Sequence, residues 1–222
     1  MTARQRGWRV PAALMALSAL PVLAGAARLV GLAGGPQLIP ADARFTASPL
    51  PVVVHIVCAA VFALLGSLQF VGGFRRRRPG WHRASGRVLV AAGAGVALSA
   101  LWLTLFFAPQ PDSGPLLLVL RIAFGSALLA TLGLGVAAIR RGDVAGHRAW
   151  MVRAYAIALG AATQVFTEGV GGAVLGDGPL ALDASRGAAW AINLAVAEWV
   201  IRRPHASGES RSGTVALAGE RS

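Results

Sequence analysis

Lysine is absent from this sequence of 222 residues, and acidic residues are scarce: 21 arginines stand against nine aspartates and glutamates, which gives a formal net charge of +12. Cys58 is the single cysteine and lies within an apolar stretch, which excludes an internal disulfide and a cysteine-rich metal cluster. Charged residues make up only 14% of the chain, hydrophobic residues make up 55%, and mean hydropathy is +0.62. Such a chain is too apolar for a water-soluble domain of its size, so we expect it in lipid.

The arginines stand in clusters between apolar runs, instead of along one polar surface. A high positive charge is also found in proteins that bind nucleic acids, but those proteins gather their cations on one face. The clustering here indicates membrane topology. We therefore expect the lipid bilayer as the partner and no nucleic acid, and the sequence identifies no protein partner.

Six apolar runs are long enough to cross a hydrocarbon core of about 30 Å, which takes roughly 20 helical residues. They lie near residues 10–34, 51–74, 87–108, 116–139, 150–175 and 184–201. None shows the alternating pattern of a barrel strand, so the prediction is an all-α integral membrane protein with a bundle of about six transmembrane helices. Residues 10–201 form this bundle, residues 1–9 precede it, and residues 202–222 are expected to be a disordered tail.

The first run also has features of a secretory signal. Arg4, Arg6 and Arg9 precede it, and small residues follow its middle at positions 24–27. Its apolar character continues to Gly34, however, which gives about 25 residues and exceeds the length of a signal core. We therefore interpret the run as an uncleaved helix.

The orientation follows from the distribution of the arginines. Of the 21, 17 lie before the first run, between runs two and three, between runs four and five, or at and after the end of run six. The other side retains four: Arg28, Arg44, Arg121 and Arg186. By the positive-inside rule, both termini are cytoplasmic, and the protein is expected in a bacterial cytoplasmic (inner) membrane.

Polar residues inside membrane spans are costly and are candidates for function. His55, Arg121 and Glu168 are each expected roughly 6–9 Å below the outer surface, so they could meet. Gln164 and Arg153 share a helical face with Glu168. One interpretation is an outer polar pocket, in which Glu168 pairs with Arg121 while His55 binds a ligand or passes a proton. The alternative is a structural Arg-Glu pair that joins two helices near the interface.

Two cytoplasmic segments repeat one chemistry. WHRASGR at residues 81–87 and GHRAWMVR at residues 146–153 each place a His-Arg pair at the entrance of an outward-going run. Paired imidazoles on different helices commonly hold membrane haem b, so His82 and His147 are candidate ligands, and Arg83 and Arg148 are candidate partners for the propionates. The alternative is an interfacial belt, in which these residues, with Trp81 and Trp150, contact anionic lipid head groups.

The chain resembles a family of predicted bacterial membrane proteins known as domain of unknown function 2306 (DUF2306). The matching elements are His55 at the opening of a span that ends in GSLQF at 66–70, the stretch WHRASGRV at 81–88, and HRAWMVRAYA at 147–156. The likeness covers roughly residues 52–199. It implies a multi-helix membrane domain, and it implies no particular activity, cofactor or catalytic residue.

Three functions remain open on these observations. The first is a small redox or sensing component that holds haem b or a quinone through helix-end histidines. The second is a small-molecule or proton-coupled transporter that uses His55, Arg121, Gln164 and Glu168. The third is a non-catalytic membrane scaffold whose arginines set the topology and bind anionic lipid.

Overall fold

The computed structural model describes residues 3–71, 77–176 and 178–203, and the described part of the chain is all-helical, with no strand. The helices are α1 (Ala3–Leu32), α2 (Leu50–Leu68), α4 (Pro79–Phe106), α5 (Pro115–Arg140), α6 (Val144–Ala158), α7 (Gly160–Leu175) and α8 (Pro179–Arg202), with a short 3-10 helix η1 (Ala43–Phe45). The predicted disordered tail after Arg203 lies outside the described residues.

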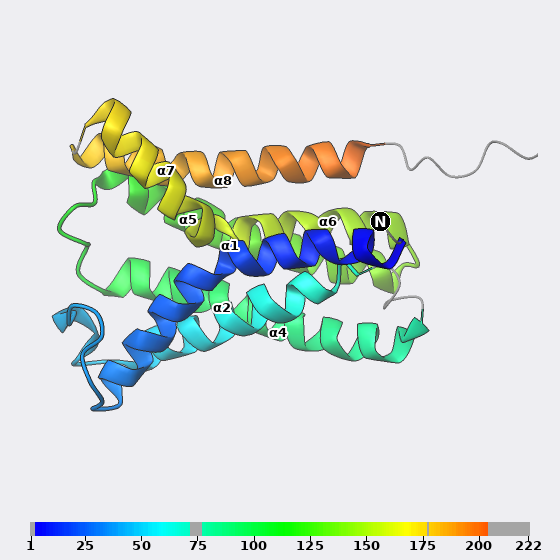
Figure 1. Ribbon diagram of the computed structural model, residues 1–222, viewed down its shortest axis with the longest axis horizontal. Coiled ribbons are helices and arrows are strands. Elements are labelled where there is room, and N and C mark those ends of the chain that lie inside the picture. The colour runs from blue at the N-terminus through cyan, green and yellow to red at the C-terminus, as the bar shows by residue number, and fades with distance from the viewer. Residues whose placement is uncertain (1–2, 72–76, 177, 204–222) are drawn as a thin grey trace, which may run out of the picture.

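The connections lie at two opposite ends of the bundle (Figure 1). The start of α1, the start of α4, the α5–α6 turn and the end of α8 lie together at one end, which we call the arginine-rich end. It carries, among others, Arg78, Arg87, Arg140, Arg148 and Arg202. The segment with η1, the α4–α5 turn and the α7–α8 turn lie at the opposite end, which we call the far end.

Among the described residues, four helices are long and apolar enough to cross a membrane: Trp8–Leu32 within α1, then α2, α4 and α5. Helices α6 and α7 have only 15 and 16 residues. Helix α8 has 24 residues but carries Asp183, Arg186 and Glu198, which lower its hydropathy. Many large apolar side chains are exposed on the outside of the bundle, as expected for surfaces that face lipid. The protein is therefore a helical membrane protein with several apolar helices.

Two predicted boundaries differ from the observed ones. The third run was expected to begin at Arg87, whereas α4 begins at Pro79, since proline is well suited to the first turn of a helix. Likewise, α6 begins at Val144, where the Asp143 side chain accepts a hydrogen bond from the Gly146 amide at 2.8 Å. His82 and His147 consequently lie on the first turns of helices and not in loops.

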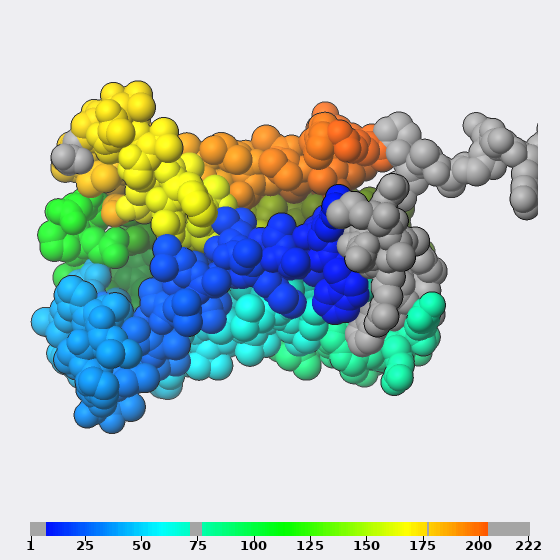
Figure 2. Space-filling view, in the orientation of Figure 1, coloured from blue at the N-terminus to red at the C-terminus, as the bar shows by residue number. Residues whose placement is uncertain are grey.

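The core lies among α2, α4, α5 and α6, with contributions from Phe62, Leu89, Leu128 and Tyr155. Helix α1 crosses the face of the molecule seen in Figures 1 and 2 and contacts α2 and α7. Helix α8 packs against α7 and, more weakly, against α6 and α5. This arrangement places α7 between the first helix and the last one.

Candidate functional site

The fifth predicted run is broken into two helices. Leu159 lies between Ala158, the last residue of α6, and Gly160, the first residue of α7. Helix α7 diverges from the direction of α6 (Figure 1). The Leu159 carbonyl accepts from the Ala162 amide at 3.0 Å, a tighter turn than the α-helical pattern. A Cβ at Gly160 would collide with the Trp190 indole of α8. The absent side chain therefore allows α8 to approach the break closely.

One asparagine on α8 bridges both halves of the break. Asn193 donates from Nδ2 to the Ala156 carbonyl of α6 at 3.1 Å, and its Oδ1 accepts from Thr163 Oγ1 of α7 at 2.9 Å. Carbonyls in the last turn of a helix lack partners within that helix, and Asn193 supplies one. Asn193 therefore forms hydrogen bonds to both α6 and α7.

The single tyrosine packs next to the break. Tyr155 donates its hydroxyl to the Ala63 carbonyl of α2 at 2.7 Å, and its ring lies against Phe62 and Phe70. Gly66 allows this approach, because a Cβ there would meet the ring. A cavity of about 20 Å³ lies between Tyr155, Val96 and Leu159. It is large enough for about one water molecule.

Charged side chains join α7 to α8 beyond the break. Arg186 Nε lies 3.2 Å from Glu168 Oε1, and its Nη2 donates to Oε2 at 3.3 Å. Gln164 Nε2 donates to the Arg186 carbonyl at 3.4 Å. The expected pairing of Glu168 with Arg121 is wrong, because α8 begins at Pro179 and brings Arg186 into the bundle two turns later.

Arg121 lies nearby with a different partner. Its Nη2 donates to Gln110 Oε1 at 2.8 Å, and it lies within electrostatic range of Glu168 and Arg186. His55 is in turn within range of Arg121, and its Nδ1 lies 3.1 Å from Ser99 Oγ of α4. A site formed by the predicted residues stays a prediction, and the pairing of Glu168 with Arg121 within it is wrong.

The sequence reasoning missed Asp183. This fully buried carboxylate on α8 accepts from the backbone amides of Gly114 at 3.2 Å and Leu117 at 2.9 Å, at the start of α5. Because α5 has no side-chain cap of its own, Asp183 caps it from a distance of 66 residues. The sequence feature that could have revealed it is Pro179 after Gly178, because proline is favoured at the first position of a helix. A helix that begins there includes Asp183.

We call the group formed by His55, Arg121, Gln164, Glu168, Asp183 and Arg186 the polar layer. It lies beyond the break, toward the far end, and joins α2, α5, α7 and α8. Nη1 of Arg186 is buried and has no hydrogen-bond partner among the residues that the structure describes. A buried guanidinium nitrogen of this kind is a position where a solute oxygen or a water can bind.

Arg153, predicted to share the face of Glu168, lies elsewhere. It belongs to α6, and its Nε donates to Glu198 of α8 at 2.5 Å, near the arginine-rich end. Its guanidinium also lies 4.7 Å from the Trp150 ring centroid. The break at Leu159 separates its helix from that of Glu168, so a single helical wheel did not apply. Glu198 also lies 3.5 Å from Arg202, one turn later on α8.

The two loop histidines lie on α4 and α6. His147 Nδ1 lies 2.8 Å from the Gly135 carbonyl of α5, and the side chain is half-buried. His82 is also half-buried, Arg83 is exposed and Arg148 is half-buried. Haem ligation by His82 and His147 stays a prediction.

An ion pair at the far end lies outside the membrane-spanning helices. Arg44 donates from Nε to Asp42 Oδ1 at 2.9 Å, and its Nη1 donates to the Ala108 carbonyl at 3.3 Å, which ties η1 to the α4–α5 turn. The hydrogen bonds from Arg44 lower the pKa of the Asp42 carboxyl, and Asp42 raises the pKa of Arg44. This contact joins the segment with η1 to the α4–α5 turn at the far end, near Arg121.

Comparison with known proteins supplies a family and no activity. No curated protein and no solved structure matches the chain. The model of one family, described as predicted membrane protein (DUF2306), matches residues 52–201, which include α2 to α8 except for the first two residues of α2 and the last residue of α8. The match covers most of the chain, and the chain belongs to the DUF2306 family of predicted membrane proteins.

Proposed function

We propose that the protein is a carrier of a small, hydrogen-bonding anion in a bacterial cytoplasmic membrane, with transport coupled to protons. The observation that carries this proposal is the crossing made of two helices, α6 and α7, with the polar layer directly beyond its break. Discontinuous helices in transporters frequently mark the substrate site, because the freed backbone groups and nearby polar side chains line it.

The proposal requires six crossings. Helices α6 and α7 together have 31 residues by their bounds, which is long enough to cross once despite the bend. Helix α8, with 24 residues, then returns the chain. The arginine-rich end is cytoplasmic by the positive-inside rule, and the polar layer consequently faces the outside.

Four side chains of the layer have a role in this proposal: Glu168, Arg186, Arg121 and His55. Glu168 orients Arg186 through two contacts, so that Nη1 is available for an oxygen of the anion. Arg121, held by the neutral Gln110, adds a second positive charge. His55 is the group of the layer that is proposed to carry the proton, because imidazole can both accept and donate one.

Reconstituted protein provides the test. Proteoliposomes are offered three radiolabelled anions that cross bare bilayers slowly: inorganic phosphate, sulfate and a four-carbon dicarboxylate. Internal pyranine reports proton entry at the same time. We expect Arg186→Gln to lower the flux at least about tenfold, because a hydrogen bond to a charged group contributes roughly 1.5–3 kcal/mol. Arg153→Gln is the matched control, since it removes another Arg-Glu pair of α8 at the opposite end.

Flux of none of the probes above that of empty vesicles, from protein that is folded and monodisperse, would contradict the carrier. An equal loss in both variants would do so as well, because it would trace the effect to packing of α8. A non-catalytic scaffold would then be the better description.

A redox role is the second candidate, and it is favoured by one observation. The contact of His147 Nδ1 with the Gly135 carbonyl leaves Nε2 as the nitrogen for a ligand, the arrangement that metal-binding histidines commonly use. His82 and His147 would hold the iron of haem b, which would supply one-electron transfer. Protein purified from haem-replete cells should then show a Soret band, and its absence would remove the haem version.

A further inference from the structure

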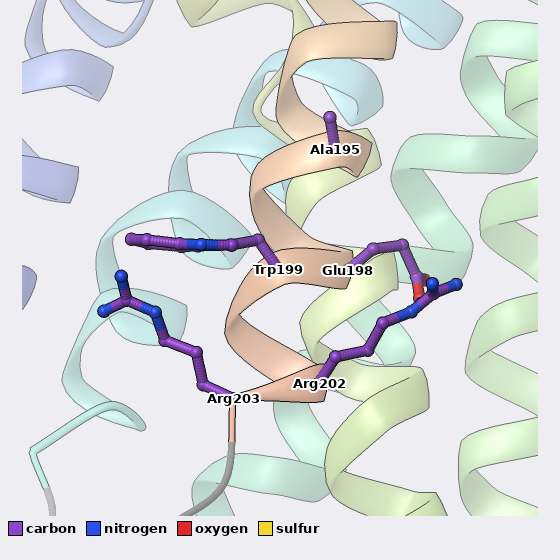
Figure 3. A pocket seen from close by; sticks show the side chains of 5 residues that line it. All are labelled: Ala195, Glu198, Trp199, Arg202 and Arg203. Carbon is purple, nitrogen blue, oxygen red and sulfur yellow. The ribbon is translucent and has the colours of Figure 1, made fainter.

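A shallow, open groove lies on α8 at the arginine-rich end. It has a volume of about 470 Å³ and is lined by Ala195, Glu198, Trp199, Arg202 and Arg203 (Figure 3). Trp199 and Arg203 lie together on one side of the helix, and Glu198 and Arg202 extend on the other side. Neither the polar layer nor the α6–α7 break includes any of these residues.

The charge of the groove is positive. Glu198 is the only acidic residue in its lining, and both of its oxygens are engaged by Arg153 of α6, at 2.5 and 3.1 Å. Arg202 approaches the same carboxylate only to 3.5 Å, and its side chain is 79% exposed. The Arg203 guanidinium lies 3.3 Å from the centroid of the Trp199 ring. The groove and its immediate surroundings thus hold one carboxylate and three guanidinium groups, which leaves an attraction for an anion.

An apolar stripe leads away from the groove along α8. Ile192, Val196 and Trp199 are spaced four and three residues apart, so they lie on one face of the helix. They are 48%, 53% and 55% exposed. The stripe runs from the groove toward the middle of the bundle, which is the direction that an acyl chain takes from the head group into a bilayer.

We infer that this groove binds an anionic phospholipid, with its phosphate at Arg202 and Arg203 and an acyl chain along Ile192, Val196 and Trp199. The joint presence of a cationic head-group site and an apolar stripe selects a lipid over a soluble phosphate. The inference rests on the six-crossing topology proposed above, which places the end of α8 at the head groups. It does not depend on transport.

Native mass spectrometry of the detergent-solubilised full chain tests the inference. Dioleoyl phosphatidylglycerol and dioleoyl phosphatidylcholine are titrated separately, and the wild type should bind the anionic lipid more tightly. The variant Arg202→Gln/Arg203→Gln should lose about tenfold or more of its affinity for phosphatidylglycerol, because each basic side chain at an anionic surface contributes roughly fivefold. Its affinity for phosphatidylcholine should change little.

The matched control is Arg140→Gln/Arg141→Gln, which removes two exposed arginines at the same end, from the end of α5. It should keep the preference for phosphatidylglycerol, and an equal loss in both double variants would overturn the inference, since net charge alone would explain it. Displacement of the lipid by inorganic phosphate at equal concentration would also overturn it. Both measurements are made without a flux assay, so a failed carrier and a failed lipid site give different results.

Discussion

At the scale of single residues, the fit of Tyr155 against Gly66 lets α2 and α6 approach each other closely. Tyr155 is 6% exposed, and its hydroxyl reaches the Ala63 carbonyl across the interface. The ring occupies the space that a side chain at position 66 would fill. Small residues that let helices approach are the usual means of association in lipid, where the hydrophobic effect does not drive helices together.

Gly66→Ala should therefore destabilise the protein, by roughly 1–3 kcal/mol, because the added methyl group displaces the Tyr155 ring. Thermal unfolding in detergent measures the effect. The control is Gly133→Ala on α5, where a Cβ meets no atom within 4 Å. That substitution should be neutral or slightly stabilising, because alanine favours helix more than glycine does. A Gly66→Ala variant as stable as Gly133→Ala would show that the interface is loosely packed.

The pair of Asp42 and Arg44 makes the η1 segment sensitive to acid. The hydrogen bonds from Arg44 hold the pKa of Asp42 below its usual value of about 3.9. The stabilisation is therefore present in full above the unfolded pKa and is lost as the pH falls through the lower folded pKa. Exchange-corrected amide protection at Arg44–Thr46 should drop by a factor of up to about five on acidification, as expected for a partly exposed pair. Asp42→Asn should show the weaker protection at pH 7 already and little dependence on pH.

Sequence reasoning selected His55, Arg121, Gln164 and Glu168 because polar residues in apolar runs can be ranked by depth alone. It could not find the partner of Glu168. The sixth predicted run begins at residue 184 and leaves Asp183 outside, since a helix that begins with Pro179 and carries charges in its first turns has low hydropathy. The depth of a polar residue follows from its position within an apolar run, whereas its partner depends on where the neighbouring helix begins.

At the scale of helices, the break between α6 and α7 could not be predicted from hydropathy. Residues 150–175 are predominantly apolar, and glycine is common in membrane helices without causing a bend. What fixes the break is a set of contacts from a distant helix: Trp190 fills the space beside Gly160, and Asn193 binds both halves. The helical face shared by Arg153 and Glu168 was consequently an artefact of assuming one straight helix.

A double-mutant cycle on Asn193 and Thr163 tests this account of the break. Asn193→Ala should lower stability by roughly 0.6–2 kcal/mol, the range for hydrogen bonds between membrane helices. Thr163→Val removes only the hydroxyl that donates to Asn193 Oδ1. The two effects should be non-additive, since they share one hydrogen bond. Urea or thermal unfolding in detergent gives the free energies, and strict additivity would mean that Asn193 acts only through the Ala156 carbonyl.

At the scale of the whole molecule, the family match leaves out a helix that packs against the rest of the bundle. The match begins at residue 52, within the first turn of α2, and leaves α1 outside. Helix α1 nevertheless contacts α2 and α7, and Gly25 of α1 faces Ile56 of α2 so closely that a Cβ would collide with it. The described part of the family domain thus comprises α2 and α4 to α8, and α1 covers one face of it (Figure 2).

The six-crossing topology predicts which positions a membrane-impermeant maleimide reaches in intact cells. In a Cys58→Ala background, Asp112→Cys and Gly178→Cys should be labelled from outside, because they lie in the turns at the far end. Arg141→Cys and Arg203→Cys should be labelled only after the membrane is permeabilised. The two positions that flank α8 are the decisive ones. If Gly178→Cys and Arg203→Cys are labelled from the same side of the membrane, α8 does not cross it. The chain would then have fewer than six crossings. Both the outward-facing polar layer and the lipid groove at the end of α8 would then be contradicted.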